Sequence, residues 1–510
     1  MSSGSRLYQS CNVNPPHDCG CAQLGNYSYI HLDQGCQLSL QKQAIIQPSI
    51  DFGGGRIEVY CSATWDLGPG TYINMDRQTT LNVEADFTIG TTGMVNMEPG
   101  STLQLKGSLA MEDLVWLTLK KDSYMVINPN SGAQASITSS ENFGITLVNL
   151  DEAASLIVNG TFTVGNGRQV TMTIQPSGTL FIGDNGEFLV ESSNFQVGPS
   201  SFWIINGHFE IDKSSSFHTG MQSNLTLNGT MQTNGGSLTV AGFSSVILQG
   251  STVNQGNMEI NEFCTLIQGP NHGGNNGIIS LTSNGELILK ELSNAKIYGY
   301  CSADGGSVTL ERAAELYIAN GGQLTLTKSA TVHLNSGSQL VLQNYEYKSE
   351  GGIMNMQSLA AVSVLGSISQ SIGSSLSFGK SSVTNFTGNF ELQSGSLIIG
   401  EGCDISIGGS FIQMGGVSNF SLQSDFMSLG SITIMKEGAL LLGQRSALNL
   451  PSGSSIMIPQ NLKIKVGSRA ILSFCPNVWC TLTNADLSIP ADSTVSVCSH
   501  TSGVLCYPIG

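Results

Sequence analysis

Three titratable side chains alternate along one short stretch of this 510-residue sequence. In the stretch GHFEIDK, an extended strand would point His208, Glu210 and Asp212 to one face and Phe209 and Ile211 to the other. A histidine beside two carboxylates could perform acid–base chemistry, such as the cleavage of a glycosidic bond. Alternation on an exposed strand produces such triplets readily, so a solvated polar surface is the alternative interpretation.

Cysteines are the second group with possible chemistry, and they gather near the two ends of the chain. These candidates for disulfides are Cys11, Cys19, Cys21, Cys36, Cys61, Cys475, Cys480, Cys498 and Cys506. Disulfides stabilise small segments that lack a large core, so the pattern predicts cysteine-bearing end caps. Two alternatives stay open. His17, Asp18, Cys19 and Cys21 could bind a metal, although C-x-C differs from the spacing of zinc modules, and all the cysteines could be reduced thiols. We expect neither a metal nor another cofactor.

An eight-residue repeat predicts the elements that carry these residues. From Ser307 the chain reads SVTLERAA, ELYIANGG, QLTLTKSA, TVHLNSGS and QLVLQNYE, with apolar residues at the second and fourth positions. The octad recurs from Thr171 and from Ser431. Four alternating residues form a short strand with two buried side chains, and the Gly, Ser, Asn and Asp residues that follow turn the chain. Such strands are stable only when stacked on copies of themselves.

The repeat therefore predicts an all-β fold, a single elongated parallel β-solenoid with three short strands in a coil of about 22 residues. We expect an N-terminal cap or attachment region at 1–70, a solenoid body at 71–474 and a C-terminal cap at 475–510. The octad pattern fails over Tyr345–Ser358, which predicts a protruding loop there. The glycine-rich stretch Asn271–Gly277 predicts a loop between coils.

Composition excludes several classes of protein. The chain has 20 basic and 36 acidic residues, a net charge of −16, and only 11% charged residues against 40% hydrophobic ones. An acidic disordered tail would have fewer apolar residues, and a nucleic-acid-binding protein would need a basic patch. The sequence contains no apolar run of membrane-spanning length, and its first 20 residues lack the apolar stretch of a secretory signal. We expect no signal peptide, no transmembrane segment and no membrane insertion.

Ser237–Asn261 (SLTVAGFSSVILQGSTVNQGNMEIN) and Ser394–Gln413 (SGSLIIGEGCDISIGGSFIQ) resemble the parallel β-helix superfamily. They are most similar to adhesin and autotransporter passenger rods and to the shafts of virus or phage surface spikes. Autotransporter passengers follow a signal peptide and are poor in cysteine, so the virion proteins are the better match. The same superfamily includes polysaccharide lyases and hydrolases with acidic residues on one outer face.

The resemblance implies a non-enzymatic structural or adhesive rod on the surface of a particle, a virion above all, facing the extracellular medium. Its partners would be copies of itself or other particle-surface proteins, with surface glycans as a further ligand. Outward apolar residues could form a stripe where rods pack side by side: Phe181, Leu189, Tyr317, Val341, Leu441 and Met457. Two alternatives are a polysaccharide depolymerase that uses His208, Glu210 and Asp212, and a secreted adhesin or lectin.

Overall fold

The computed structural model describes strands between residues 6 and 508, and side chains over most of 73–127, 152–159, 178–269, 278–343 and 349–448, with short gaps. All regular structure in the described residues is β-strand, which confirms the expected all-β class. Strands pair in parallel with strands one coil later, as in a β-solenoid. The chain divides into two compact units, Met1–Thr252 and Val253–Gly510, and the boundary falls within β30 (Ser251–Asn254).

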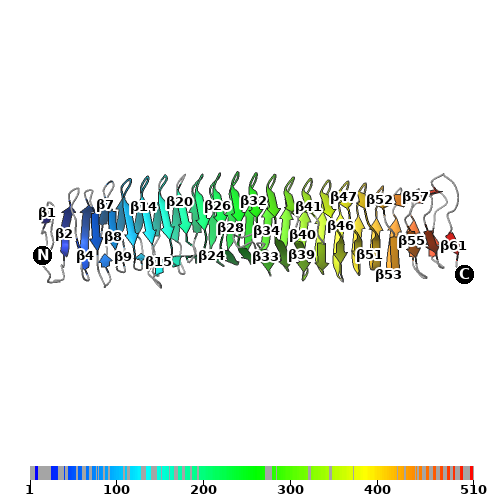
Figure 1. Ribbon diagram of the computed structural model, residues 1–510, viewed down its shortest axis with the longest axis horizontal. Coiled ribbons are helices and arrows are strands. Elements are labelled where there is room, and N and C mark those ends of the chain that lie inside the picture. The colour runs from blue at the N-terminus through cyan, green and yellow to red at the C-terminus, as the bar shows by residue number, and fades with distance from the viewer. Residues whose placement is uncertain are drawn as a thin grey trace. The chain divides into compact units, whose positions relative to one another are not determined.

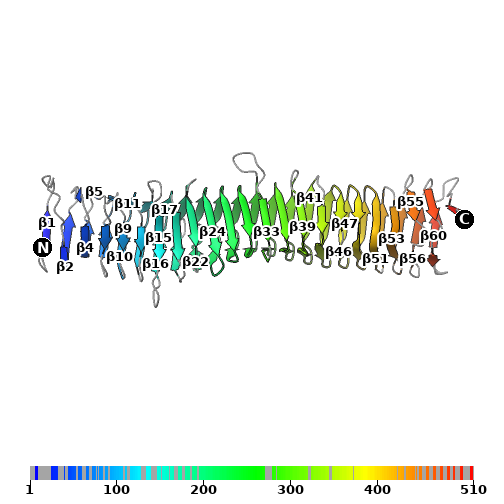
Figure 2. The same ribbon diagram turned by 90° about the horizontal axis from the view of Figure 1, so that it is seen from below.

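Unit 1 contains three series of stacked strands, one strand of each series per coil (Figures 1 and 2). The first series is β6 (Trp65–Leu67), β9 (Phe87–Ile89), β12 (Leu109–Met111), β15 (Gln134–Thr138), β18 (Thr161–Gly165), β21 (Glu187–Val190), β24 (His208–Asp212) and β27 (Thr230–Asn234). The second is β7 (Tyr72–Met75), β10 (Met94–Met97), β13 (Trp116–Leu119), β16 (Thr146–Leu150), β19 (Val170–Ile174), β22 (Asn194–Val197), β25 (Ser216–His218) and β28 (Ser237–Val240). The third is β3 (Ser39–Leu40), β5 (Arg56–Val59), β8 (Thr80–Val83), β11 (Thr102–Leu105), β14 (Tyr124–Ile127), β17 (Ser155–Val158), β20 (Thr179–Ile182), β23 (Phe202–Ile205), β26 (Asn224–Leu227) and β29 (Ser245–Leu248). Before them lie β1 (Arg6–Gln9), β2 (Leu24–Leu32) and β4 (Ala44–Phe52).

Unit 2 repeats the arrangement. Its first series is β33 (Ile278–Thr282), β36 (Tyr300–Asp304), β39 (Gln323–Thr327), β42 (Tyr347–Glu350), β45 (Ile368–Gln370), β48 (Phe390–Leu392), β55 (Ser455–Ile458), β58 (Trp479–Leu482) and β61 (Cys506–Pro508). The second is β31 (Asn257–Ile260), β34 (Glu286–Leu289), β37 (Ser307–Leu310), β40 (Thr331–Leu334), β43 (Ile353–Met356), β46 (Ser374–Phe378), β49 (Gly395–Ile399), β56 (Lys463–Val466) and β59 (Asp486–Ser488). The third is β32 (Thr265–Gln268), β35 (Asn294–Ile297), β38 (Glu315–Ile318), β41 (Gln339–Gln343), β44 (Ala361–Leu365), β47 (Val383–Phe386), β50 (Asp404–Ile407), β52 (Asp425–Ser428), β54 (Ala447–Leu450), β57 (Ile471–Phe474) and β60 (Thr494–Val497). The long strands β51 (Phe411–Phe420) and β53 (Ile432–Leu442) pair with both of the first two series.

The register confirms the predicted coil of about 22 residues. Met94 pairs with Trp116 and Thr102 pairs with Tyr124, each 22 positions later. Longer coils occur where residues are inserted between strands, as when Tyr124 pairs with Ser155. Coil length therefore varies along the chain, while the three-strand plan is kept.

Alternation buries two side chains of each short strand, as the octads predict. Along β37 to β40, the second and fourth residues of every strand are buried, for example Val308 and Leu310. In unit 1 the core contains a group of aromatic rings, with Phe195 stacked on Phe217 at 5.2 Å between ring centroids and Trp203 edge-on to both. These contacts supply the apolar burial that a short strand cannot supply alone.

A left-handed residue turns the chain before many strands of the third series. Ser200, Gln222 and Phe243 have φ between 57° and 60°, and each is followed by a buried serine such as Ser201. The Ser201 hydroxyl donates to the Gly198 carbonyl at 2.6 Å and so closes the turn. The turn needs a small residue at the buried position, which explains why serine, alanine or cysteine occupies it.

Glycines stack at another corner of unit 1, where the coils approach too closely for a side chain. A Cβ on Gly229 would lie 1.7 Å from the Gly207 carbonyl oxygen, and one on Gly250 would lie 1.5 Å from the Gly229 carbonyl oxygen. Asn228, which precedes Gly229, donates from Nδ2 to Asn206 Oδ1 one coil earlier at 2.7 Å. Close backbone packing therefore requires glycine at this corner.

The expected protruding loop at 345–358 is wrong, because β42 and β43 occupy it and Met354 and Met356 are buried. The octad fails there because two glycines and a longer spacing interrupt it, although the alternation IMNM survives. The expected loop at 271–277 lies outside the described residues. Parallel pairs occur before residue 71 and after 474, as in β1–β2 and β58–β61, and the proposed cap boundaries stay predictions.

Candidate functional site

The predicted triplet lies on β24, in the first series of unit 1. The strand alternates as expected, with Phe209 and Ile211 fully buried and His208, Glu210 and Asp212 partly exposed on the outer face. β21 lies on one side of β24 and β27 on the other. The sequence therefore predicted correctly which side chains share a face.

Hydrogen bonds engage two members of the triplet, His208 and Glu210. His208 Nδ1 lies 2.8 Å from the Thr230 hydroxyl, and His208 Nε2 lies 3.4 Å from Glu210 Oε2. The other carboxylate oxygen of Glu210 accepts a hydrogen bond from the Asn234 amide. Gln232 Nε2 donates to Asn234 Oδ1 at 2.5 Å. Five side chains on β24 and β27 thus form one polar network.

This network occupies His208 and Glu210, two of the three groups that a hydrolase would use here. Both oxygens of Glu210 already have partners, and the partners belong to the protein itself. Asp212 lies two positions further along the same strand, about 6.6 Å away by the strand rise, a separation that inverting glycosidases use. The spacing of Glu210 and Asp212 suits a catalytic carboxylate pair. The hydrogen bonds of His208 and Glu210, however, join β24 to β27 in the next coil.

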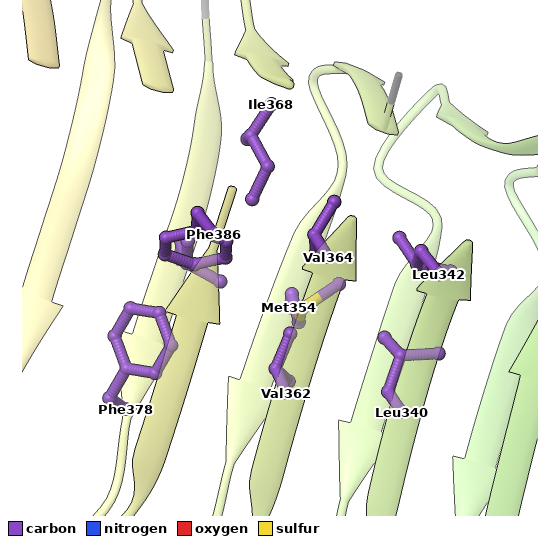
Figure 3. Close-up of a pocket in the computed structure, with 9 residues that line it drawn as sticks. Leu340, Leu342, Met354, Val362, Val364, Ile368, Phe378 and Phe386 are labelled. Atoms are coloured by element: carbon purple, nitrogen blue, oxygen red, sulfur yellow. The ribbon is translucent and has the colours of Figure 1, made fainter. Parts of the chain in front are cut away.

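Among the described residues, no group of three or more His, Cys, Asp and Glu side chains is arranged to bind a metal ion. A cavity of about 10 Å³ lies in the core of unit 2, lined only by apolar side chains such as Leu340, Met354, Ile368 and Phe386 (Figure 3). Its volume is about that of one water molecule. It is a packing defect and is too small for a sugar.

Ion pairs between coils are the charged feature that sequence reasoning missed. Lys290 lies 2.9 Å from Glu311 and 3.5 Å from Glu259, so it joins the coils before and after it. The hydrogen bond to Glu311 raises the pKa of Lys290. Further pairs are Glu98–Lys120, Lys121–Glu152, Glu291–Arg312, Asp304–Lys328 and Lys380–Glu401. The partners lie 21 to 31 positions apart, so the predicted coil length of about 22 residues was only a partial signal, because insertions change the spacing.

The nine cysteines proposed for end caps lie where the structure describes no side chains. The backbone register does pair Cys480 on β58 with Cys506 on β61. The described cysteines Cys264, Cys301 and Cys403 are buried thiols. Burial raises the pKa of the Cys301 thiol to about 12. Disulfide caps therefore remain a prediction.

The outward apolar residues lie where alternation placed them. Phe181, Leu189, Tyr317, Val341 and Leu441 are each partly exposed, whereas the side chain of Met457 is outside the described residues. Sequence reasoning missed their neighbours in the stack. Phe181 pairs with Ile157 on one side and Ile204 on the other, and these pairs emerge only once the register is known.

Comparison of the chain with protein-family models and with curated proteins finds no match. No helix in the described part of the chain is long and apolar enough to cross a membrane. The fold and the surface chemistry are therefore the basis for a functional proposal.

Proposed function

We propose that this chain is a non-enzymatic structural or adhesive component on the surface of a particle, and that the particle is a virion. The observation that carries the proposal is the use of outward polar and charged groups to join coils. Glu210 bonds to the next coil through Asn234, and Lys290 bonds to the coils on both sides. A surface whose polar groups bind one another strengthens the contacts between coils, which suits a structural role.

Parallel pairing supports a mechanical role for each unit. Within each unit, successive strands of a series pair through the backbone, as from β34 to β37 to β40. Apolar ladders inside and polar ladders outside add to these bonds, so local opening of one coil must break three kinds of contact. Resistance to proteases follows, because cleavage needs a locally opened chain.

The location on a particle and the attachment to surface glycans rest on the resemblance to virus and phage spike shafts. Mass spectrometry of purified particles tests the location, with fractionation of the producing cells as its counterpart. Detection in particles at a fixed ratio to the other coat components is expected. Recovery from the medium without particles would favour a secreted adhesin or lectin.

A polysaccharide depolymerase is the second candidate, and the shared outer face of His208, Glu210 and Asp212 is what favours it. A sugar-release assay on acidic and neutral polysaccharides separates the two functions. We expect no release by the full chain. Release that is lost in Glu210→Gln but kept in Glu391→Gln, a matched change on the same strand series of unit 2, would overturn the structural role.

A further inference from the structure

The outer face of the third series in unit 1 differs from the described outer faces of the other two series of that unit. From β11 to β29, no outward position holds a charged residue. Seven of these positions are apolar and together form what we call the apolar strip: Tyr124, Val126, Ile157, Phe181, Phe202, Ile204 and Ile247. Tyr124, Phe202 and Ile204 are 45%, 50% and 36% exposed.

Register makes the apolar strip continuous from β14 to β23, whereas Ile247 on β29 is separated from Ile204 by Thr226 on β26. Val126 pairs with Ile157, Ile157 with Phe181, and Phe181 with Ile204, so one outward column is apolar over four successive coils. Tyr124 and Phe202 lie in the adjacent column of the same strands. At the edge of this face, Met221 in the preceding turn is 51% exposed. Large continuous apolar patches on a protein surface mark binding sites.

The described outward residues on the other two series of unit 1 are mostly polar, with Trp116 and Leu189 among the apolar exceptions. On the first series, β24 and β27 present His208, Glu210, Gln232 and Asn234, which bond to one another. The described outward residues of the second series are mostly Asn, Gln, Ser, Thr and His. Among the outward residues of unit 1 that the structure describes, a run of apolar residues over four successive coils is found only on the third series.

We infer that the apolar strip binds the apolar strip of a second copy of this chain. The charge of the chain indicates which partner binds the apolar strip. The chain has a net charge of −16, so two copies repel unless the faces that meet are uncharged. The apolar strip buries no carboxylate and no amine when it meets itself, and sheets pack face to face through apolar side chains. A two-fold axis near Phe181 would pair Ile157 of one copy with Ile204 of the other.

The area sets the strength of this pairing. Seven strands spaced by about 4.8 Å, each four residues wide, give a face of roughly 450 Å² per copy, against about 800 Å² in a stable interface. Pairing in dilute solution is therefore weak and reversible, and dimers form only as the protein concentration rises. On a particle surface, where copies are held at high local concentration, the same contact becomes persistent. This inference deepens the proposed structural role and rests on it.

Analytical ultracentrifugation of the full chain over a range of concentrations tests the pairing. We expect reversible dimers in the wild type, and Phe181→Lys should move the midpoint of association about tenfold or more to higher concentration. Gln196→Lys is the matched control, because it adds the same charge to an exposed position of the second series on β22, and it should leave the midpoint unchanged. Circular dichroism and melting temperature check that each variant is folded.

A mixing experiment makes the test specific. Phe181→Lys and Phe181→Glu should each stay monomeric alone and associate when mixed, because opposite charges then meet across the two-fold axis. A wild type that stays monomeric at all concentrations, or dimers that are unchanged in Phe181→Lys, would overturn the pairing. Binding of soluble oligosaccharides that is lost in Phe181→Lys, without dimers, would also overturn it and identify the apolar strip as a sugar site. The structural role is tested separately by the sugar-release assay, and none of these outcomes affects that assay. Failure of the pairing can therefore be distinguished from failure of the structural role.

Discussion

One outward carboxylate, that of Asp425, destabilises the fold when it is ionised. Asp425 on β52 lies in register with Asp404 on β50, one coil earlier. Partial burial, and then the neighbouring Asp404 charge, raise the pKa of Asp425. A raised carboxyl pKa means that the folded state binds the proton more tightly than the unfolded chain does. The ionised group therefore destabilises the fold above its folded pKa, and this penalty disappears below the unfolded pKa.

We predict that Asp425→Asn raises the melting temperature at pH 7. Asp404→Asn should raise it less, because it removes only the repulsion and leaves the burial of Asp425 in place. Both gains should shrink as the pH falls towards the ordinary aspartate pKa. Differential scanning calorimetry at several pH values measures this. A gain that is constant from pH 7 to pH 3.5 would contradict the electrostatic cause.

Buried thiols give a second prediction at this scale. Because burial raises the pKa of Cys301 to about 12, roughly one thiol in ten thousand is ionised at pH 8, and the thiolate is the reactive form. The native chain should leave Cys301 unmodified by iodoacetamide, whereas the chain in denaturant should be fully alkylated there. Peptide mass spectrometry after timed labelling reads this out. Rapid labelling of Cys301 in the native chain would show that the core around β36 opens readily.

At the scale of elements, the corner glycines control how closely coils stack. Gly229→Ala would place its Cβ 1.7 Å from the Gly207 carbonyl oxygen, so backbone must move. We predict a loss of about 2 to 3 kcal/mol in the free energy of unfolding, as for an overpacked core. Gly269→Ala is the control, since a Cβ there meets nothing within 4 Å, and its effect should stay within about 0.5 kcal/mol. Urea titration measures both, and equal effects would contradict the close approach.

The strands and their buried residues could be predicted from the sequence, whereas the contacts between coils could not. The octads from Ser307 predicted β37 to β40 with the correct buried residues, because burial of alternate side chains is a local property. The pairing of Lys290 with Glu311, or of Phe181 with Ile204, could not be predicted in the same way. Coil length varies with insertions, as between Tyr124 and Ser155. One unknown insertion changes which residues are neighbours in all later coils. Predicting neighbours on the outer surface therefore requires the register, whereas predicting which side chains are buried does not.

At the scale of the whole molecule, net charge opposes the pairing that the apolar strip favours. At pH 7 each copy carries −16, and the repulsion acts over the Debye length, about 30 Å at 0.01 M salt and about 8 Å at 0.15 M. The contact itself is uncharged, so salt screens the repulsion without weakening the attraction. An interface built on ion pairs would show the opposite dependence.

We therefore predict that dimers of the full chain become more abundant as NaCl rises from 0.01 M to 0.5 M at pH 7. Lowering the pH towards the pI of about 4.8 at low salt should act in the same direction, because the net charge falls. Sedimentation velocity at one protein concentration measures both trends, and Phe181→Lys should flatten them. Dimers that dissociate as salt is added would place the contact on the charged ladders instead, and the apolar strip would then need another occupant.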